Sequence, residues 1–307
     1  MLRYLLNRIL WLISIVLAAT VVVFAIVHLA GDPTNGFIEP GASPEVRAQI
    51  RHNLGLDDPL AVQYAHFIGH AATGDFGTSW RADRPALQLV IDRLGPTLLL
   101  AGSALTLAVL IGIGSGAAIA RNWVGTSGVL SVLVSVGMAL PSFWVGATLV
   151  LLFAVNLGWL PSSGGGSARA LILPAITLAL QPTAVIARLT ETQLREALGS
   201  DFVRTARGKG LTEPAVFLRH ALRPGLGPIL AFIGIQIGFL IGGAVIVEGV
   251  FAYPGVGLLA LNAVKDRDLP IIQAFVVVTA LLISLTTMLI DIVARLIDPR
   301  IAAGSTA

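Results

Sequence analysis

The sequence of 307 residues contains no cysteine and little charge. Without cysteine the chain cannot form disulfides, zinc–thiolate sites or iron–sulfur clusters. Charged residues make up only 12% of the chain, which is about half their share in an average soluble protein. Hydrophobic residues make up 55%, and the mean hydropathy is +0.86. This composition predicts an integral membrane protein.

The chain also lacks a nucleotide-binding loop. The nearest fragment to Gly-x4-Gly-Lys-Ser/Thr is Gly208-Lys209-Gly210, whose spacing does not match. We therefore expect no cofactor in this chain, and any ATP and Mg²⁺ to be bound by another. The net charge of +3 is spread over few titratable groups, so no nucleic-acid binding is predicted.

Six apolar segments are long enough to cross a bilayer as helices, which takes about 20 residues. Each must be helical, because lipid offers no hydrogen-bond partner to the backbone. The sequence therefore predicts an all-α integral membrane fold with spans at roughly 9–30, 96–120, 128–157, 171–190, 226–250 and 271–296.

The first of these segments follows Arg3 and Arg8, an arrangement that a signal peptide would also show. Its apolar run is longer than the core of a typical signal peptide, and no small-x-small cleavage site follows it. We expect a retained span.

Basic residues indicate the orientation of these spans, because they gather on the cytoplasmic side. The two short outer loops hold only Arg169 and then Lys265 with Arg267. The segment between the fourth and fifth spans is far more basic, with Arg188, Arg195, Arg204, Arg207, Lys209, Arg219 and Arg223. Both termini of this multi-pass membrane protein are therefore predicted to be cytoplasmic.

The expected division of the chain follows from these spans. An extracytoplasmic helical domain is expected at 31–95, with one helix from Ser43-Pro44 to Gly55 and another from Pro59 to about Gly74. The expected segments are an N-terminal end with the first span at 1–30, the outer domain at 31–95, a five-helix core at 96–300 that includes a cytoplasmic loop at 191–224, and a tail at 301–307.

The sequence favours neither a histidine metal site nor an intramembrane protease site. His66 and His70 are four apart on a predicted helix, but no third metal ligand is evident. An intramembrane serine protease needs a serine and a histidine facing each other. Only His28 lies in a span, near its outer end, and the intramembrane serines are Ser115, Ser131 and Ser135.

Small residues recur every fourth position in two spans, which places them on one helical face where backbones can approach closely. A helix–helix seam is favoured over the lining of a passage. The residues are Ala104, Ala108, Gly112, Gly116 and Ala120 in the second span, and Gly234, Gly238 and Gly242 in the fifth.

Polar residues inside the spans are few. Such residues normally face a cavity or a partner, because isolated polar groups are costly in lipid. Gln236 and Glu248 are candidates for substrate contact, while Glu248 and Asp291 are also near enough to helix ends to be interfacial.

Residues 200–222 predict two short helices set at an angle. Ser200 or Asp201 can cap the first helix, and Gly210 suits the left-handed position that ends it. Thr212 can cap the second, which has Pro214 in its first turn and runs to Pro224. A basic loop at the lipid headgroups is the alternative, but two capped helices favour docking onto a protein partner.

This segment resembles the coupling loop of ABC-importer permeases, most closely the B-type subunits of dipeptide, oligopeptide and nickel systems. The resemblance lies in the run Asp201-Phe202-Val203-Arg204-Thr205-Ala206-Arg207-Gly208-Lys209-Gly210-Leu211, followed by Arg219-His220-Ala221-Leu222-Arg223-Pro224. The general importer motif begins Glu-Ala-Ala, and Arg204-Thr205-Ala206 stand in its place.

Further blocks of the family pattern extend over nearly the whole chain. They include Gly31-Asp32-Pro33, Leu54-Gly55-Leu56-Asp57, Gly74-Asp75-Phe76-Gly77, Pro141-Ser142-Phe143-Trp144, Leu157-Gly158-Trp159-Leu160-Pro161, Pro254-Gly255-Val256-Gly257 and Asp298-Pro299-Arg300.

The resemblance implies the architecture of a type I ABC-importer permease that has no enzymatic activity of its own. It implies a homologous second permease, two ATPase subunits and an extracytoplasmic substrate-binding protein as partners, besides membrane lipid. The resemblance implies short peptides as the main expected cargo, and nickel complexes or another small solute as the alternatives. A stand-alone secondary transporter or channel is the alternative, although we find no internal repeat of the kind such carriers show.

Overall fold

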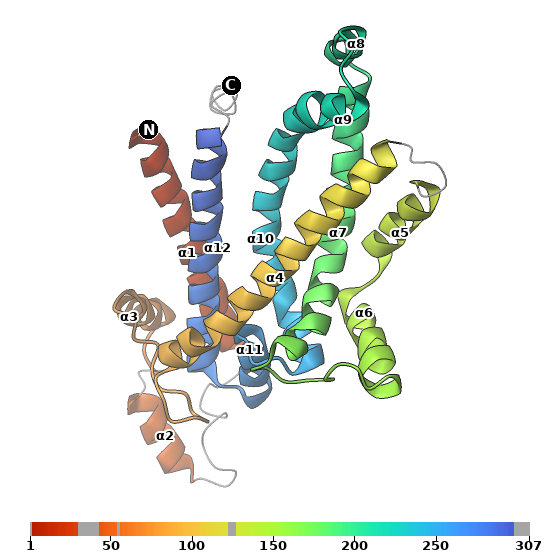
Figure 1. The fold of residues 1–307 in the computed structure, drawn as a ribbon. Coiled ribbons are helices and arrows are strands. Elements are labelled where there is room, and N and C mark those ends of the chain that lie inside the picture. The colour runs from red at the N-terminus through yellow and green to blue at the C-terminus, as the bar shows by residue number, and fades with distance from the viewer. Residues whose placement is uncertain (1, 30–42, 54–55, 122–126, 298–307) are drawn as a thin grey trace. The chain divides into compact units, whose positions relative to one another are not determined.

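A computed structural model describes residues 2–29, 43–53, 56–121 and 127–297. The described residues form helices joined by short loops, together with one isolated bridge between Thr78 and Pro85 (Figure 1). The motifs at 31–33 and 298–300, the dipeptide Leu54-Gly55 and the predicted tail 301–307 lie outside the described residues.

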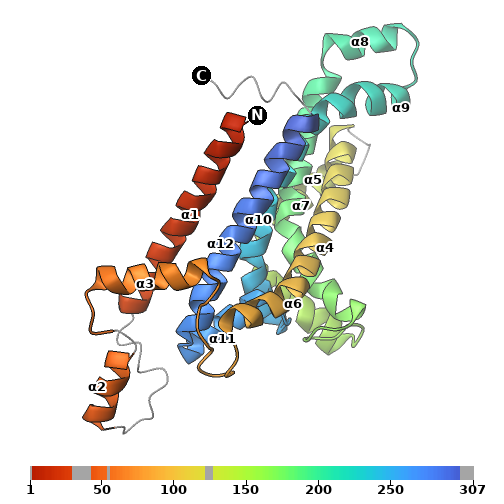
Figure 2. The same cartoon turned by 90° about the vertical axis from the view of Figure 1, so that its left-hand side faces the viewer.

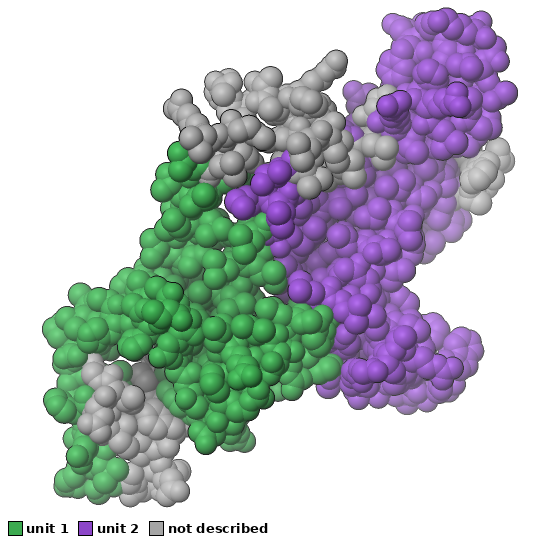
Figure 3. Space-filling view, turned by 60° about the vertical axis from the view of Figure 1, so that its left-hand side comes forward, with its two compact units in different colours: residues 1–97, 254–285 green, residues 98–253, 286–307 purple. Residues whose placement is uncertain are grey.

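The chain divides into two compact units, coloured separately in Figure 3. Unit 1 comprises residues 1–97 and 254–285, and unit 2 comprises residues 98–253 and 286–307. The helices α4 and α12 run from one unit into the other. The elements are α1 Leu2–Leu29, α2 Pro44–Asn53, α3 Leu60–Ala72, α4 Ala86–Ala120, α5 Ser127–Ala139, α6 Ser142–Leu149, the π-helix η2 Val150–Asn156, α7 Ala168–Leu198, α8 Asp201–Gly208, α9 Glu213–Ala215, the π-helix η3 Val216–Leu222, α10 Arg223–Phe251, α11 Val256–Asp266 and α12 Leu269–Ile297.

In unit 1, α3 lies beside the C-terminal end of α1 (Figure 2). The hydroxyls of Thr20 and Tyr64 are 3.0 Å apart, and His28 Nε2 is 2.9 Å from Gln63 Oε1. The helices α2 and α3 lie where the Pro and Gly signals at 43–44, 55, 59 and 74 predict them.

The loop before α4 is joined to the start of α12. The Ser79 hydroxyl donates to Oδ2 of Asp268 at 2.5 Å, and the backbone N–H of Arg81 points to the same oxygen at 3.4 Å. Both Ser79 and Asp268 are buried. The described part of the segment 31–95 therefore packs with α11 and the first part of α12 through Phe76, Ala86 and Val90.

In unit 2, α7 is the central helix, and it packs against α5, α6 and α10. Its apolar core gathers buried residues of three helices, among them Leu100 of α4, Leu173 and Ile186 of α7, and Leu240 and Phe251 of α10. Because α7 is covered on several sides, it is the most buried of the long apolar helices.

Among the described residues, five helices are long and apolar enough to cross a membrane: α1, α4, α7, α10 and α12. The segment 128–157, predicted as a single span, is instead two helical pieces bent by 110° at a break between Ala139 and Ser142. Pro141 explains the break, because proline disfavours helical backbone at the residue before it and has no N–H for a helical bond. Counted as one broken span, this pair gives six.

Two helix boundaries and one whole helix also differ from the prediction. The helix α4 begins at Ala86 and contains Pro96, which was predicted to start it. The helix α7 continues to Leu198, well past residue 190. The amphipathic helix α11 lies between the fifth and sixth predicted spans, where only a short loop was predicted, because it is too short and too polar to be recognised as a span.

The small residues of α4 lie against α7. A Cβ added to Gly112 would come within 2.9 Å of Cβ of Ile186, and one added to Gly116 would overlap the backbone of Ala187. In the fifth span, a Cβ on Gly234 would overlap Ile290 of α12, whereas Gly242 has nothing within 4 Å. Gly238 is half-buried.

The contact between α4 and α7 predicts a difference between two neighbouring glycines. Gly116→Ala should lower the free energy of unfolding, because overpacking a tight contact costs ~1–3 kcal/mol. Gly114, which has nothing within 4 Å, is the matched control. Gly114→Ala should be neutral or stabilise the helix by up to ~1 kcal/mol. Thermal unfolding of both variants in detergent measures the difference, and equal midpoints would contradict this packing.

Candidate functional site

The first candidate site is the basic hairpin, residues Asp201–Leu222, which follows α7 (Figure 1). Ser200 occupies the N-cap position of α8, but its hydroxyl donates back to the carbonyl of Ala197 at 2.5 Å instead of capping the helix. Asp201 lies in the first turn, where a carboxylate interacts favourably with the helix dipole.

The turn of the hairpin depends on Gly210. Its φ of +78° lies in the left-handed region, which strains any residue with a side chain. The N–H of Gly210 donates to the carbonyl of Arg207 at 2.9 Å, and the N–H of Leu211 donates to that of Ala206 at 3.3 Å. These two bonds end α8. A Cβ at position 210 would meet no atom within 4 Å, so glycine is needed there for its backbone conformation and not for lack of space.

A small core and an ion pair hold the two arms of the hairpin together. Val203, Ala206 and Val216 are buried against one another. The Arg207 guanidinium donates through Nε to Oε1 of Glu213 at 2.8 Å and through Nη2 to Oε2 at 3.2 Å. This two-bond contact lowers the pKa of the Glu213 carboxyl and raises the pKa of Arg207. Both groups are therefore charged at neutral pH.

The base of the hairpin is anchored on the ends of α4 and α7. Phe217 and Ala221 are buried in a cluster with Ala120, Leu194 and Ala197. The Arg121 guanidinium carbon lies 5.0 Å from the centre of the Phe217 ring, within the range of a cation–π contact.

The exposed surface of the hairpin, which we call its tip, presents apolar and basic side chains of both arms together. Phe202 is 48% exposed and Leu218 is 60% exposed. Arg204, which makes only a 3.4 Å contact with Asp201, is also exposed, as are Thr205, Gly208, Lys209 and Leu211. A rigid base with an exposed apolar and basic tip suits docking into a groove on another protein.

The second arm of the hairpin does not end at Pro224 as predicted. Helical backbone continues without a break from Glu213 through η3 into α10 and to Phe251. The π-helical turn of η3 comes directly before Pro224, which has no N–H to give to a regular helical bond. The second arm of the hairpin and α10 are consequently one uninterrupted but bent run of helical backbone (Figure 1).

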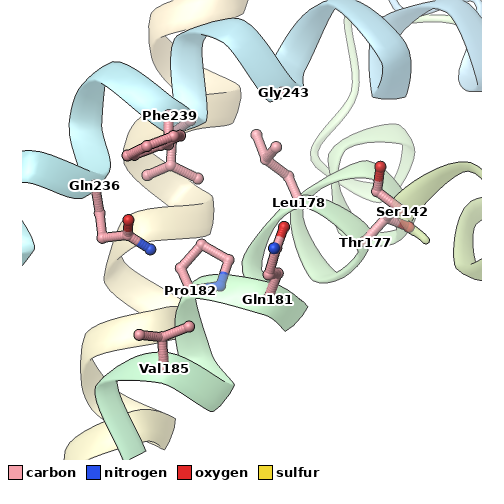
Figure 4. A pocket seen from close by; sticks show the side chains of 10 residues that line it. Ser142, Thr177, Leu178, Gln181, Pro182, Val185, Gln236, Phe239 and Gly243 are labelled. Carbon is pink, nitrogen blue, oxygen red and sulfur yellow. The ribbon is translucent and has the colours of Figure 1, made fainter. Parts of the chain in front are cut away.

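The second candidate site is a pocket between α6, α7 and α10, near the middle of α7 and α10 (Figure 4). Its volume is about 200 Å³. Gln236 lines it and is only 7% exposed. The lining is Ser142, Thr177, Leu178, Gln181, Pro182, Val185, Gln236, Phe239, Leu240 and Gly243.

Sequence reasoning missed Gln181, Thr177 and Ser142 as members of this pocket. The sequence does contain a signal for Gln181, because it is a polar carboxamide inside an apolar run. It also precedes Pro182, which has no N–H for the helical bond to the carbonyl of Leu178. Glu248, the other residue predicted to contact the cargo, is fully buried near the end of α10 and is not among the residues that line the pocket. The side chain of Asp291 lies outside the description.

Four of the residues considered for metal binding or proteolysis, His28, His70, Ser115 and Ser135, have other contacts. His70 Nδ1 is 3.5 Å from Asp75, and no cluster of three metal-binding side chains occurs among the described residues. Ser115 donates to the carbonyl of Ile111, and Ser135 donates to that of Ser131. His28 contacts the Phe24 carbonyl and Gln63.

Known proteins share this sequence and this fold. Residues 108–303 match the family described as binding-protein-dependent transport system inner membrane component, and residues 1–101 match its N-terminal family. The glutathione transport system permease protein GsiC of Salmonella typhimurium is 42% identical over 98% of this chain and 99% of its own length. GsiC of Escherichia coli K12 is 39% identical over the same shares.

Solved structures of lower identity share the fold alone. A chain of the inward-facing MetNI methionine ABC transporter superposes with a TM-score of 0.58 at 18% identity, over 68% of this chain and 95% of its own. A chain of an amino acid ABC transporter with histidines gives 0.53 at 20% identity, over 69% and 94%. This chain therefore belongs to the binding-protein-dependent inner membrane components and is a non-catalytic, multi-pass permease subunit of an ABC importer of the peptide/oligopeptide family.

Proposed function

We propose that this permease pairs with a homologous second permease, two ATPase subunits and an extracytoplasmic binding protein to import short peptides. The relatives named for glutathione, itself a short peptide, are 39–42% identical over nearly the full length and support this cargo. The ATPase subunits would bind ATP and Mg²⁺. A secondary transporter working alone is not favoured, because the family works with a binding protein.

The basic hairpin carries this proposal. Its residues 201–211 would sit in a groove of one ATPase, with Phe202 and Arg204 at the contact. Movement of the ATPases would be transmitted through the hairpin, because Arg207 and Glu213 join its arms and Phe217 anchors its base. The continuous helix from Glu213 to Phe251 would carry that movement to Gln236 in the pocket.

The proposal also gives the membrane orientation of the chain, a role for the outer segment and the residues that contact the cargo. Both termini and the hairpin would face the cytoplasm, which the basic residues around 188–223 support. The outer segment 31–95, including α2 and α3, would help to receive the binding protein. Gln236, and on a changed conformation Glu248, would contact the cargo. The switch between inward- and outward-facing states would be a rigid-body transition between two packed arrangements.

Substitutions at the hairpin tip test the coupling. Arg204→Ala removes an exposed cation, and truncation of an interface hot spot costs ~2 kcal/mol or more, a factor of about 30 in affinity. Gly210→Val strains the turn. Both variants should insert normally yet lose ATP-driven uptake in vesicles from cells that express all partner chains, whereas Arg169→Ala in an outer loop should not. Normal uptake in both hairpin variants would exclude this coupling role.

The ion pair in the hairpin predicts a dependence on pH. Because the folded hairpin lowers the pKa of Glu213, the pair stabilises it at neutral pH and is lost as the pH falls through that lowered value. Glu213→Gln should therefore speed hydrogen exchange of the α8 amides at pH 7, with a difference from wild type that shrinks in acid.

Exchange rates corrected for the intrinsic effect of pH measure this difference. Glu196→Gln, at an exposed position of α7, is the matched control and should leave α8 unchanged. A Glu213→Gln effect of the same size at all pH values would mean that the charge of the pair does not matter.

A further inference from the structure

The pocket between α6, α7 and α10 holds a buried polar group without a partner of its own. Gln236 is only 7% exposed, whereas Gln181 is exposed, and within the described part of the chain neither carboxamide makes a hydrogen bond. A buried polar group that lacks a partner is costly, above all inside a bilayer. The carboxamide atoms of Gln236 are not among the fully buried atoms that lack a partner, so they open into the pocket, where a molecule that enters can bind them.

The two carboxamides come from different helices. Figure 4 shows Gln236 on α10 and Gln181 on α7, with Pro182 between them. Pro182 adds a further acceptor, because it has no N–H to give to the carbonyl of Leu178, which also lines the pocket. Amide donors and acceptors thus lie on both sides of one small space.

The rest of the lining is uncharged. Ser142 and Thr177 supply hydroxyls, and the other members, Phe239 among them, are apolar. Phe239 is 70% exposed, which is unusual for an aromatic side chain beside a buried amide. The described lining residues include no acid or base, so the pocket has no means of pairing with a charged end or side chain of a ligand.

Carboxamide side chains match a peptide bond in both donor and acceptor. The volume of about 200 Å³ is below the ~300–1,000 Å³ of pockets that enclose a whole drug-sized ligand. A short stretch of peptide backbone fits this space and this chemistry.

We propose that Gln181 and Gln236 bind the backbone amides of the peptide in transit, and that this pocket reads the main chain without regard to side-chain charge. The inference rests on the proposed function, since it requires a peptide cargo. Within the membrane, recognition of the cargo would then depend on two carboxamides that bind its main chain, and the side chains of the cargo would be recognised elsewhere.

An amide-to-ester exchange in the cargo tests this inference. The complete complex, reconstituted in proteoliposomes with its binding protein, is offered a short peptide or its depsipeptide, in which one amide N–H is replaced by an ester oxygen. Uptake at low cargo concentration gives a ratio of amide to ester. The same binding protein serves every permease variant, so its own preference cancels when ratios are compared between variants.

We expect the amide-to-ester uptake ratio to fall about fivefold in Gln236→Leu, because one hydrogen bond to the cargo is lost. The ratio should fall further in the double variant with Gln181→Leu, which loses a second hydrogen bond. Gln236→Asn keeps the amide chemistry and should retain most of the wild-type ratio. Gln193→Leu, further along α7 and outside the pocket, is the matched control and should leave the ratio unchanged.

An unchanged ratio in the Leu variants, with peptide uptake intact, would overturn the inference and leave the proposed function standing. An equal fall of amide and ester uptake would also overturn it, because the glutamines would then act only on the structure. A wild-type complex that hydrolyses ATP but imports no peptide would overturn the proposed function and the inference together.

Discussion

A lipid bilayer gives the backbone no hydrogen-bond partner, and every feature of this permease that bears on transport follows from how the chain meets that constraint. Regular helices satisfy their own backbone. Where proline prevents this, as at Pro141 and Pro182, the chain bends or opens a small polar space. Polar side chains inside the spans obey the same rule, so Gln236 lies in a pocket and Glu248 is fully buried.

The same helices connect the two candidate sites. The basic hairpin is held rigid by the buried Val203 and Val216 and by the pair between Arg207 and Glu213. Its second arm becomes α10 without a break, and α10 carries Gln236. Under the proposed function, a push on the hairpin would reach the pocket through this continuous helical backbone and not through a loop.

Sequence reasoning predicted the helices well, because a run of apolar residues has one stable form in lipid. The left-handed turn at Gly210 was predicted for a similar reason, since it depends on local chemistry alone. The bend at Pro141 was missed, because hydropathy is the same on both sides of it. The helix α11 was missed for lack of length, and Gln181 joined the pocket only through the packing of α7 against α10. Such pairings between distant segments depend on tertiary contacts that local patterns do not contain.

The central claim, that the tip of the basic hairpin contacts an ATPase subunit, has a direct test in cross-linking. The chain has no cysteine, so Phe202→Cys introduces its only thiol. Trp159→Cys, at an exposed position in another loop, is the control. With all partner chains present in native membranes, a thiol-to-amine cross-linker should join Cys at 202, but not at 159, to the ATPase. The cross-link should change in yield when ATP is added. Absence of any ATPase adduct at 202, in an assembled complex that still hydrolyses ATP, would contradict the account.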